Sequence, residues 1–96
     1  MIVHIVMFAF KEDNKEQNML KAKVMLEALE KSIEPLVSME VGIDFNRSER
    51  AYDLALYSTF ETKEGLRTYA THPAHLEVVA FIKEVTQSSK VVDYER

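Results

Sequence analysis

Residues 2–10 constrain the fold more than any other part of the chain, because this segment is apolar on both faces of a strand. One face carries His4 among apolar side chains, and the opposite face is entirely apolar, with Val3, Ile5, Met7 and Ala9. A strand of this kind lies inside a sheet that is covered on both sides. The fold must therefore place this segment centrally and provide cover for both faces of its sheet.

A helix is predicted after the charged turn at residues 11–15. Asn14, with Gln17 three residues later, is typical of an N-cap with a partner at the third helical position. Apolar residues then recur at helical spacing, at Ala22, Met25, Leu26, Leu29 and Ile33. We expect this helix to end near residue 32, ahead of Pro35.

Three strands and two further helical segments are predicted in the rest of the chain. Residues 36–45 are apolar on one face only, as in an edge strand, whereas residues 51–60 are largely apolar on both faces. A short helix over residues 63–71 is followed by a helical segment that begins at Pro73, since proline is favoured in a first turn. Residues 91–94 form the closing strand.

This order of elements is that of a ferredoxin-like βαββαβ protomer in the α+β class. In that topology a four-stranded antiparallel sheet carries the helices on one face, and the first and third strands lie in the middle. These are the two strands that are apolar on both faces, so pattern and topology agree. The length of 96 residues predicts a single domain over residues 1–96.

Helices on one face leave the second apolar face of the sheet without cover. A second copy of the chain that lays its own sheet there would cover it, and burial contributes about 25 cal/mol per Å² of apolar surface. We therefore expect a symmetric homodimer through the sheet face. The alternative is a monomer in which the same face forms a groove for an apolar ligand.

Composition argues against several classes of function. A formal charge of -4, with acids and bases mixed along the chain, leaves no basic patch for nucleic acid. Neither a secretory signal nor a membrane-spanning segment is recognisable, so we expect a cytoplasmic protein with no membrane partner. The lack of cysteine excludes disulfides and cysteine nucleophiles, and two glycines cannot build a glycine-rich phosphate loop.

The candidate site residues are concentrated in the segment Tyr69-Ala70-Thr71-His72-Pro73-Ala74-His75. His75 stands at helical spacing before Val78, so we expect it to head the inward-facing stripe of the last helix. It can act as a general base near neutral pH, or it can hold the helix break through a hydrogen bond. The Tyr69 hydroxyl can donate to a developing enolate, or Tyr69 is an ordinary core tyrosine.

His72 and Pro73 are expected to have a structural role, because a residue before proline is driven out of the helical conformation and suits a cap or hinge. His4 stands on an apolar strand face, where an imidazole needs a partner, and we expect it to belong to the site. A metal centre of His4, His72 and His75 would need a ligand from a distant strand. We therefore expect neither a metal nor a cofactor.

With its elements placed in this way, the chain resembles the stress-responsive α/β-barrel domain family, known as Dabb. The resemblance rests on residue groups found in order, namely residues 4–11, Val41-Gly42, Tyr52-Asp53-Leu54 with Thr59-Phe60, Tyr69 with His72-Pro73-Ala74-His75, and Val92-Asp93-Tyr94. It spans essentially the whole chain. It implies a ferredoxin-like protomer that pairs into a dimeric α+β barrel, in a family whose members mostly have no assigned reaction.

A minority of that family, the plant polyketide cyclases, close a linear polyketide by aldol condensation without cofactor or metal. The resemblance matches their catalytic tyrosine and histidine to Tyr69 and His75, and a further histidine at their site to His4. The chain departs from them at Leu54, where they carry another histidine, and at Tyr57, which replaces an acidic residue. The substrate class of the cyclases is therefore not carried over.

Three hypotheses for the function follow. The first is a homodimeric module of unassigned activity that binds a small apolar or carbonyl ligand. The alternative is a cofactor-independent enzyme of aldol-cyclase or isomerase type, with His75 as base, Tyr69 as donor and His4 orienting the substrate. A monooxygenase related to other ferredoxin-like dimers is a third hypothesis, but the chain lacks their characteristic residues. The enzyme hypothesis requires an open cavity between the sheet and the helices. A filled interior would rule out this hypothesis.

Overall fold

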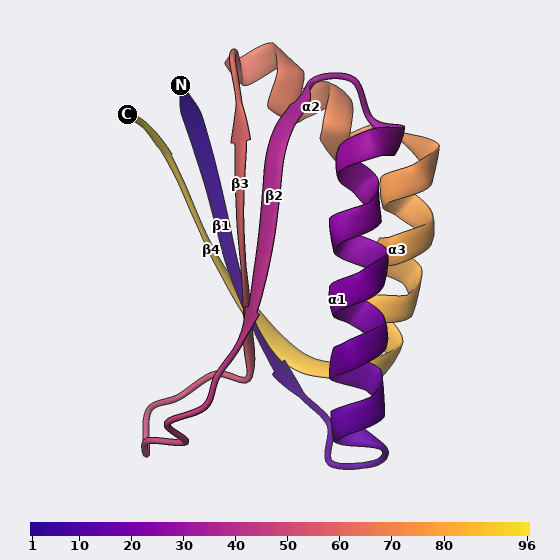
Figure 1. Ribbon diagram of the computed structural model, residues 1–96, viewed down its shortest axis with the longest axis vertical. Coiled ribbons are helices and arrows are strands. Elements are labelled where there is room, and N and C mark those ends of the chain that lie inside the picture. Colours follow the sequence, from indigo (N-terminus) through magenta and orange to yellow (C-terminus); the bar gives the residue numbers. More distant parts are fainter.

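The computed structural model describes all 96 residues as one four-stranded sheet with helices packed on one of its faces (Figure 1). The elements, in chain order, are β1 (Ile2–Phe10), α1 (Lys15–Ser32), β2 (Leu36–Ile43), β3 (Leu54–Phe60), α2 (Lys63–Thr71), α3 (Pro73–Val85) and β4 (Thr86–Glu95). All strand pairs are antiparallel, in the order β2-β3-β1-β4. No helix is long and apolar enough to cross a membrane.

The central positions of β1 and β3 confirm the ferredoxin-like βαββαβ fold. Val6 on β1 pairs with Leu56 on β3 and with Val91 on β4, so β1 is paired on both sides. β2 and β4 form the two edges of the sheet. The two strands whose patterns are apolar on both faces are therefore the two that the sheet encloses.

The hydrophobic core lies between the sheet and the helices. The buried residues on this side include Phe8, Phe10, Leu26, Leu29, Leu54, Leu56, Phe60, Tyr69, Val78 and Ile82. Helix α1 packs along β2, and α3 packs beside α1 (Figure 1). This arrangement brings the inner face of α3 over the central strands. The side chain of His4 lies on this same side of the sheet.

The opposite face of the sheet carries apolar side chains that nothing covers. Met7 is 38% exposed, and Val92 and Tyr94 are 56% and 43% exposed. The strand register places them on one continuous face, because Val92 pairs with Ile5 and Tyr94 pairs with Val3. The uncovered apolar face that the sequence predicts is therefore present in the protomer.

The last strand is longer than its apolar pattern indicates. It begins at Thr86, which pairs with Phe10, whereas the prediction placed its start at residue 91. Residues 86–90 are polar and mostly exposed at the edge of the sheet. Their sequence therefore has no apolar pattern that would indicate a strand. β2 and β3 are shorter than predicted, because residues 44–53 form a loop between them that projects from the sheet (Figure 1).

The predicted N-cap at Asn14 has the right position but the wrong chemistry. Asn14 precedes α1 with φ 52° and ψ 34°, in the left-handed region, and its side chain makes no capping hydrogen bond. Side-chain caps require an extended backbone at this position. The prediction of a capping pair with Gln17 is therefore wrong.

Candidate functional site

A cavity of about 180 Å³ lies between α3 and the helix-facing side of the central strands. Its apolar lining comes from both layers and consists of Val6, Phe8, Leu26, Leu56, Val78, Val79 and Ile82. Its polar lining consists of His4, Tyr69, His75, Lys83, Thr86 and Ser89. Since an apolar cavity of about 150 Å³ holds a benzene ring, this space has room for a small cyclic molecule.

Tyr69 forms one wall of the cavity from the last turn of α2. Its side chain is buried, and its ring packs edge-on against Phe60 at a centroid distance of 5.1 Å. The hydroxyl has no hydrogen-bond partner within the protein. Burial raises the pKa of this hydroxyl well above its usual value, so the group remains a protonated donor. A buried donor without a partner is destabilising, and a ligand acceptor would relieve that cost.

His75 stands in the first turn of α3, with its ring centroid 4.2 Å from that of Tyr69. Its Nδ1 lies 3.1 Å from the carbonyl oxygen of Ala70. A carbonyl only accepts, so Nδ1 carries the hydrogen and the neutral ring leaves Nε2 as the basic nitrogen. Burial lowers the pKa of His75 against the opposing effect of the Ala70 carbonyl, and the neighbouring His4 and His72 lower it further. His75 is therefore neutral at pH 7.

His4 reaches the same cavity from β1. Its ring centroid is 6.2 Å from that of Tyr69, and its Nδ1 is hydrogen-bonded to the carboxylate of Asp93 on β4. The strand register accounts for this pair, because His4 and Asp93 are direct partners in the antiparallel β1–β4 ladder. The partner that an imidazole on an apolar face needs is thus supplied by the neighbouring strand.

His72 and Pro73 lie at the break between α2 and α3 and do not line the cavity. The Nδ1 of His72 accepts a hydrogen bond from the backbone N–H of Ala74 at 3.0 Å, and Pro73 occupies the first turn. His72 is thus engaged at the start of α3. The structure brings together no group of three or more His, Asp or Glu side chains that could hold a metal ion.

The site contains residues that sequence reasoning did not single out. Asp93 holds His4, while Lys83, Thr86 and Ser89 line the cavity at the other end of α3. Asp93 could have been found by aligning the first and last segments as antiparallel neighbours, because it then faces His4. Lys83 and Ser89 carry no such signal, since exposed polar residues near a helix end are common.

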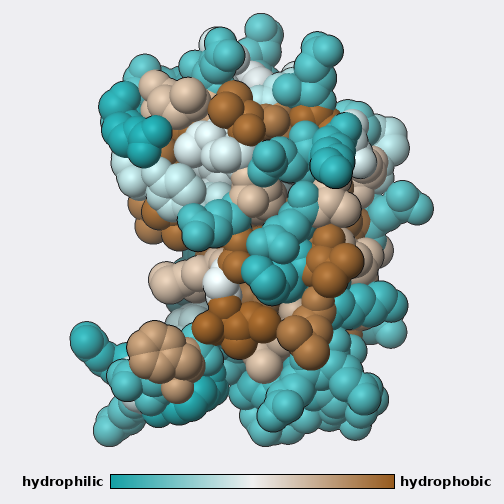
Figure 2. Space-filling view, in the orientation of Figure 1, coloured by the Kyte–Doolittle hydropathy of each residue, from teal (hydrophilic) through white to brown (hydrophobic).

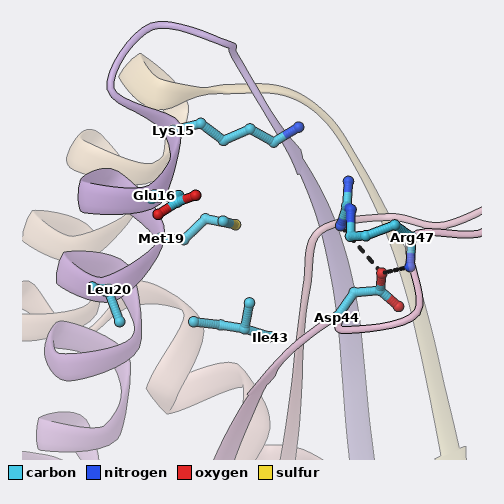
Figure 3. Close-up of a pocket in the computed structure, with 7 residues that line it drawn as sticks. All are labelled: Lys15, Glu16, Met19, Leu20, Ile43, Asp44 and Arg47. Carbon is cyan, nitrogen blue, oxygen red and sulfur yellow. Dashed lines mark hydrogen bonds and ion pairs between the residues drawn. The ribbon is translucent and has the colours of Figure 1, made fainter.

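A second hollow, of about 390 Å³, lies at the seam between α1 and the end of β2, where Figure 2 shows apolar side chains at the surface. Figure 3 shows side chains of α1 on one side of this hollow and Ile43, Asp44 and Arg47 on the other. Asp44 accepts hydrogen bonds from the Arg47 backbone and guanidinium. Two acidic and two basic residues therefore line this hollow, and Asp44 and Arg47 pair with one another.

The buried carboxylate of Asp53 pairs with Lys15 and Arg47, the two basic residues that line this second hollow. It accepts from the backbone N–H of Phe10 at 2.7 Å and from Arg47 at 2.7 Å, and Lys15 lies 3.2 Å away. Burial opposes ionisation, but these donors outweigh it and hold the pKa of Asp53 below its usual value. Because Lys15 and Arg47 are already paired with the Asp53 carboxylate, we interpret this hollow as a junction that stabilises the fold and not as a ligand site.

The model of the family described as "Stress responsive A/B Barrel Domain" matches residues 2–96. The chain belongs to this family. A stress-response A/B barrel domain-containing protein of Arabidopsis thaliana, At5g22580, is 32% identical over 94 residues, covering 95% of this chain and 82% of that protein.

Solved structures share the fold over nearly the whole chain. A dimeric protein of unknown function with a ferredoxin-like fold from Bacteroides fragilis superposes with a TM-score of 0.91 at 33% identity, covering 99% of this chain and 95% of that chain. At3g17210 from Arabidopsis thaliana superposes with a TM-score of 0.88 at 26% identity, covering 100% and 95%. Family membership and fold are therefore shown, and no specific activity is assigned by them.

Proposed function

We propose that this protein is a homodimeric module that binds a small apolar molecule carrying a hydrogen-bond acceptor, most simply a carbonyl oxygen. The observation that carries the proposal is the Tyr69 hydroxyl, which is buried without a partner beside a cavity of about 180 Å³ whose lining is more than half apolar. Ligand sites combine an apolar lining with a few converging polar groups. Tyr69, His75 and His4 are those groups here.

The homodimer in this proposal uses the uncovered face of the sheet. Met7, Val92 and Tyr94 are exposed there in the protomer, on the side opposite the helices. The Bacteroides fragilis relative is a dimeric protein, which supports the same assembly for this chain. Because the cavity lies on the helix side, each protomer would keep its own site. We place the dimer in the cytoplasm, a compartment with which a chain without cysteine agrees.

Acetophenone is a direct probe of this binding function, because it joins a phenyl ring to one carbonyl acceptor. The expected result is one molecule bound per protomer in a calorimetric titration, with NMR shifts centred on the signals of Tyr69 and His75. Absence of binding, or shifts confined to the outer face of the sheet, would overturn the proposal.

A second candidate function is proton transfer next to a carbonyl, and the neutral state of His75 favours it. The Nε2 of His75 would remove a proton from the carbon beside the carbonyl, and the Tyr69 hydroxyl would donate to the enolate oxygen that forms. In an isomerase the proton would then return from Nε2 to a carbon atom. In an aldol-type enzyme the enolate carbon would instead attack a second carbonyl carbon, and Nε2 would give the proton to the alkoxide oxygen that forms. Paired with Asp93, His4 would orient the substrate.

Deuterium exchange tests this second function separately from binding. In D₂O, acetophenone would exchange its methyl hydrogens faster with the wild-type protein than with His75→Asn, whose amide can keep the donor to Ala70. Equal exchange rates for the two proteins would remove the enzyme hypothesis and leave the binding module.

A further inference from the structure

The cavity has two polar ends that differ in charge. Tyr69, His75 and His4 gather at one end, near the start of α3, and Lys83, Thr86 and Ser89 line the other. His75 and Lys83 are eight positions apart on α3, which corresponds to about 12 Å of helix rise. On the sheet, His4 pairs with Asp93, and Phe8 pairs with Ser89 four positions further along β1. The distance between the two ends of the cavity is therefore similar along α3 and along the strands of the sheet.

Lys83 is the one lysine or arginine in the lining, which contains no aspartate or glutamate. Its ammonium group takes part in none of the ion pairs of the protein. Ser89 also makes no side-chain hydrogen bond, whereas the hydroxyl of Thr86 donates to the carbonyl of Ile82. The far end of the cavity thus offers a free cation and a free hydroxyl.

One carboxylate, that of Asp93, lies beside the opposite end of the cavity, although it is not part of the lining. Asp93 is hydrogen-bonded to His4, beside Tyr69 and His75, so an anionic group placed there would be repelled by its carboxylate. A neutral acceptor is suited to that end, and an anion is suited to the end at Lys83. The charge distribution consequently orients any ligand that carries both groups.

Resting on the proposed binding function, we infer that the cavity takes a small ring-bearing keto acid. Its carbonyl oxygen accepts from Tyr69, and its carboxylate binds the ammonium group of Lys83, with Ser89 as a second donor. A charge-assisted hydrogen bond is stronger than a neutral one. Lys83 therefore determines specificity for an anion, while Tyr69 binds the carbonyl group.

Two isosteric probes test this inference, namely 4-acetylbenzoate and the neutral 4-acetylbenzamide. We expect the benzoate to bind about tenfold more tightly, which corresponds to about 1.4 kcal/mol. In Lys83→Met this preference should disappear, because neither probe then meets a cation at that end of the cavity. Lys31→Met is the matched control, because Lys31 is exposed near the end of α1, forms no ion pair and does not line the cavity.

The outcomes separate this inference from the proposed function. If acetophenone binds but wild type shows no preference for the benzoate, the anion site at Lys83 is wrong and the carbonyl site stands. If the preference survives in Lys83→Met, or is lost equally in Lys31→Met, the assignment to Lys83 is overturned. If none of the three probes binds, both the inference and the proposed function fail.

Discussion

The rings of Tyr69 and His75 lie 4.2 Å apart between centroids, with their planes inclined by 38°, across the break that separates α2 from α3. One member of this pair is a protonated hydroxyl without a partner, and the other is a neutral imidazole with Nε2 as its basic nitrogen. A donor and a base are thereby held side by side at the wall of one cavity. The helix break allows this contact, because it lets two consecutive helices converge on the same space.

Stability should depend on pH through His75. Its pKa in the folded protein is lowered, mainly by burial, so the unfolded chain binds a proton at His75 more readily. This contribution is fully present above about pH 6.5, the ordinary pKa of histidine, and is lost as the pH falls through the lower folded pKa. Urea unfolding of wild type and His75→Asn between pH 7.5 and 5 measures the effect. The wild type should lose more stability over this range, and parallel profiles would contradict the account.

His72 should contribute to stability without contributing to binding. His72→Ala removes the acceptor for the backbone N–H of Ala74 at the start of α3, and loss of a cap costs about 1 kcal/mol. His72→Asn supplies another capping acceptor and should restore most of this loss. Thermal unfolding and acetophenone titration of both variants are the measurements. A large loss of affinity in the stable His72→Asn variant would place His72 in the binding site instead.

The buried carboxylate of Asp53 should stabilise the junction between β1, α1 and the loop of residues 44–53. Asp53→Asn removes the charge that accepts from Phe10, Arg47 and Lys15, and we expect a loss of about 2–3 kcal/mol in the free energy of unfolding. Glu49→Gln is the control, because Glu49 is exposed in the same loop, and should change stability by less than about 0.5 kcal/mol. Similar losses in the two variants would refute the special role of Asp53.

The proposed dimer should depend on Met7, which lies on the uncovered face of the central strand β1. Met7→Glu places a charge where the partner sheet would pack, and the desolvation of that charge should convert the dimer to monomers. Val24→Glu on α1 is the control, since Val24 is 68% exposed on the opposite layer. Sedimentation velocity should show a monomer for the first variant and a dimer for the second. A monomeric wild type would contradict the assembly.

Much of the fold could be predicted from local pattern because burial on both faces leaves an apolar signal, as in residues 2–10 and 51–60. The same reasoning fails for residues 86–90, which are polar at the sheet edge and become a strand only through pairing with β1. It also fails at Asn14, because residue type alone does not reveal a left-handed backbone.

The candidate site was predictable only in part. Tyr69, His75 and His4 attract attention because polar rings on apolar faces are unusual, and they line one cavity. Asp93 and Lys83 join them through strand register and through the position of α3 over the sheet, which are tertiary relationships. Their residue types are ordinary for exposed positions, so sequence pattern alone does not distinguish them.

The most direct test of the cavity as a ligand site compares wild type with Tyr69→Phe for both stability and acetophenone affinity. Removal of a buried hydroxyl that has no partner should leave stability unchanged or raise it by about 1 kcal/mol, while affinity falls about five- to tenfold because the ligand carbonyl loses its donor. Tyr57→Phe, on the other face of the sheet, should leave affinity unchanged. A Tyr69→Phe protein that is clearly less stable and binds acetophenone as tightly as wild type would make Tyr69 an ordinary core residue and contradict the account.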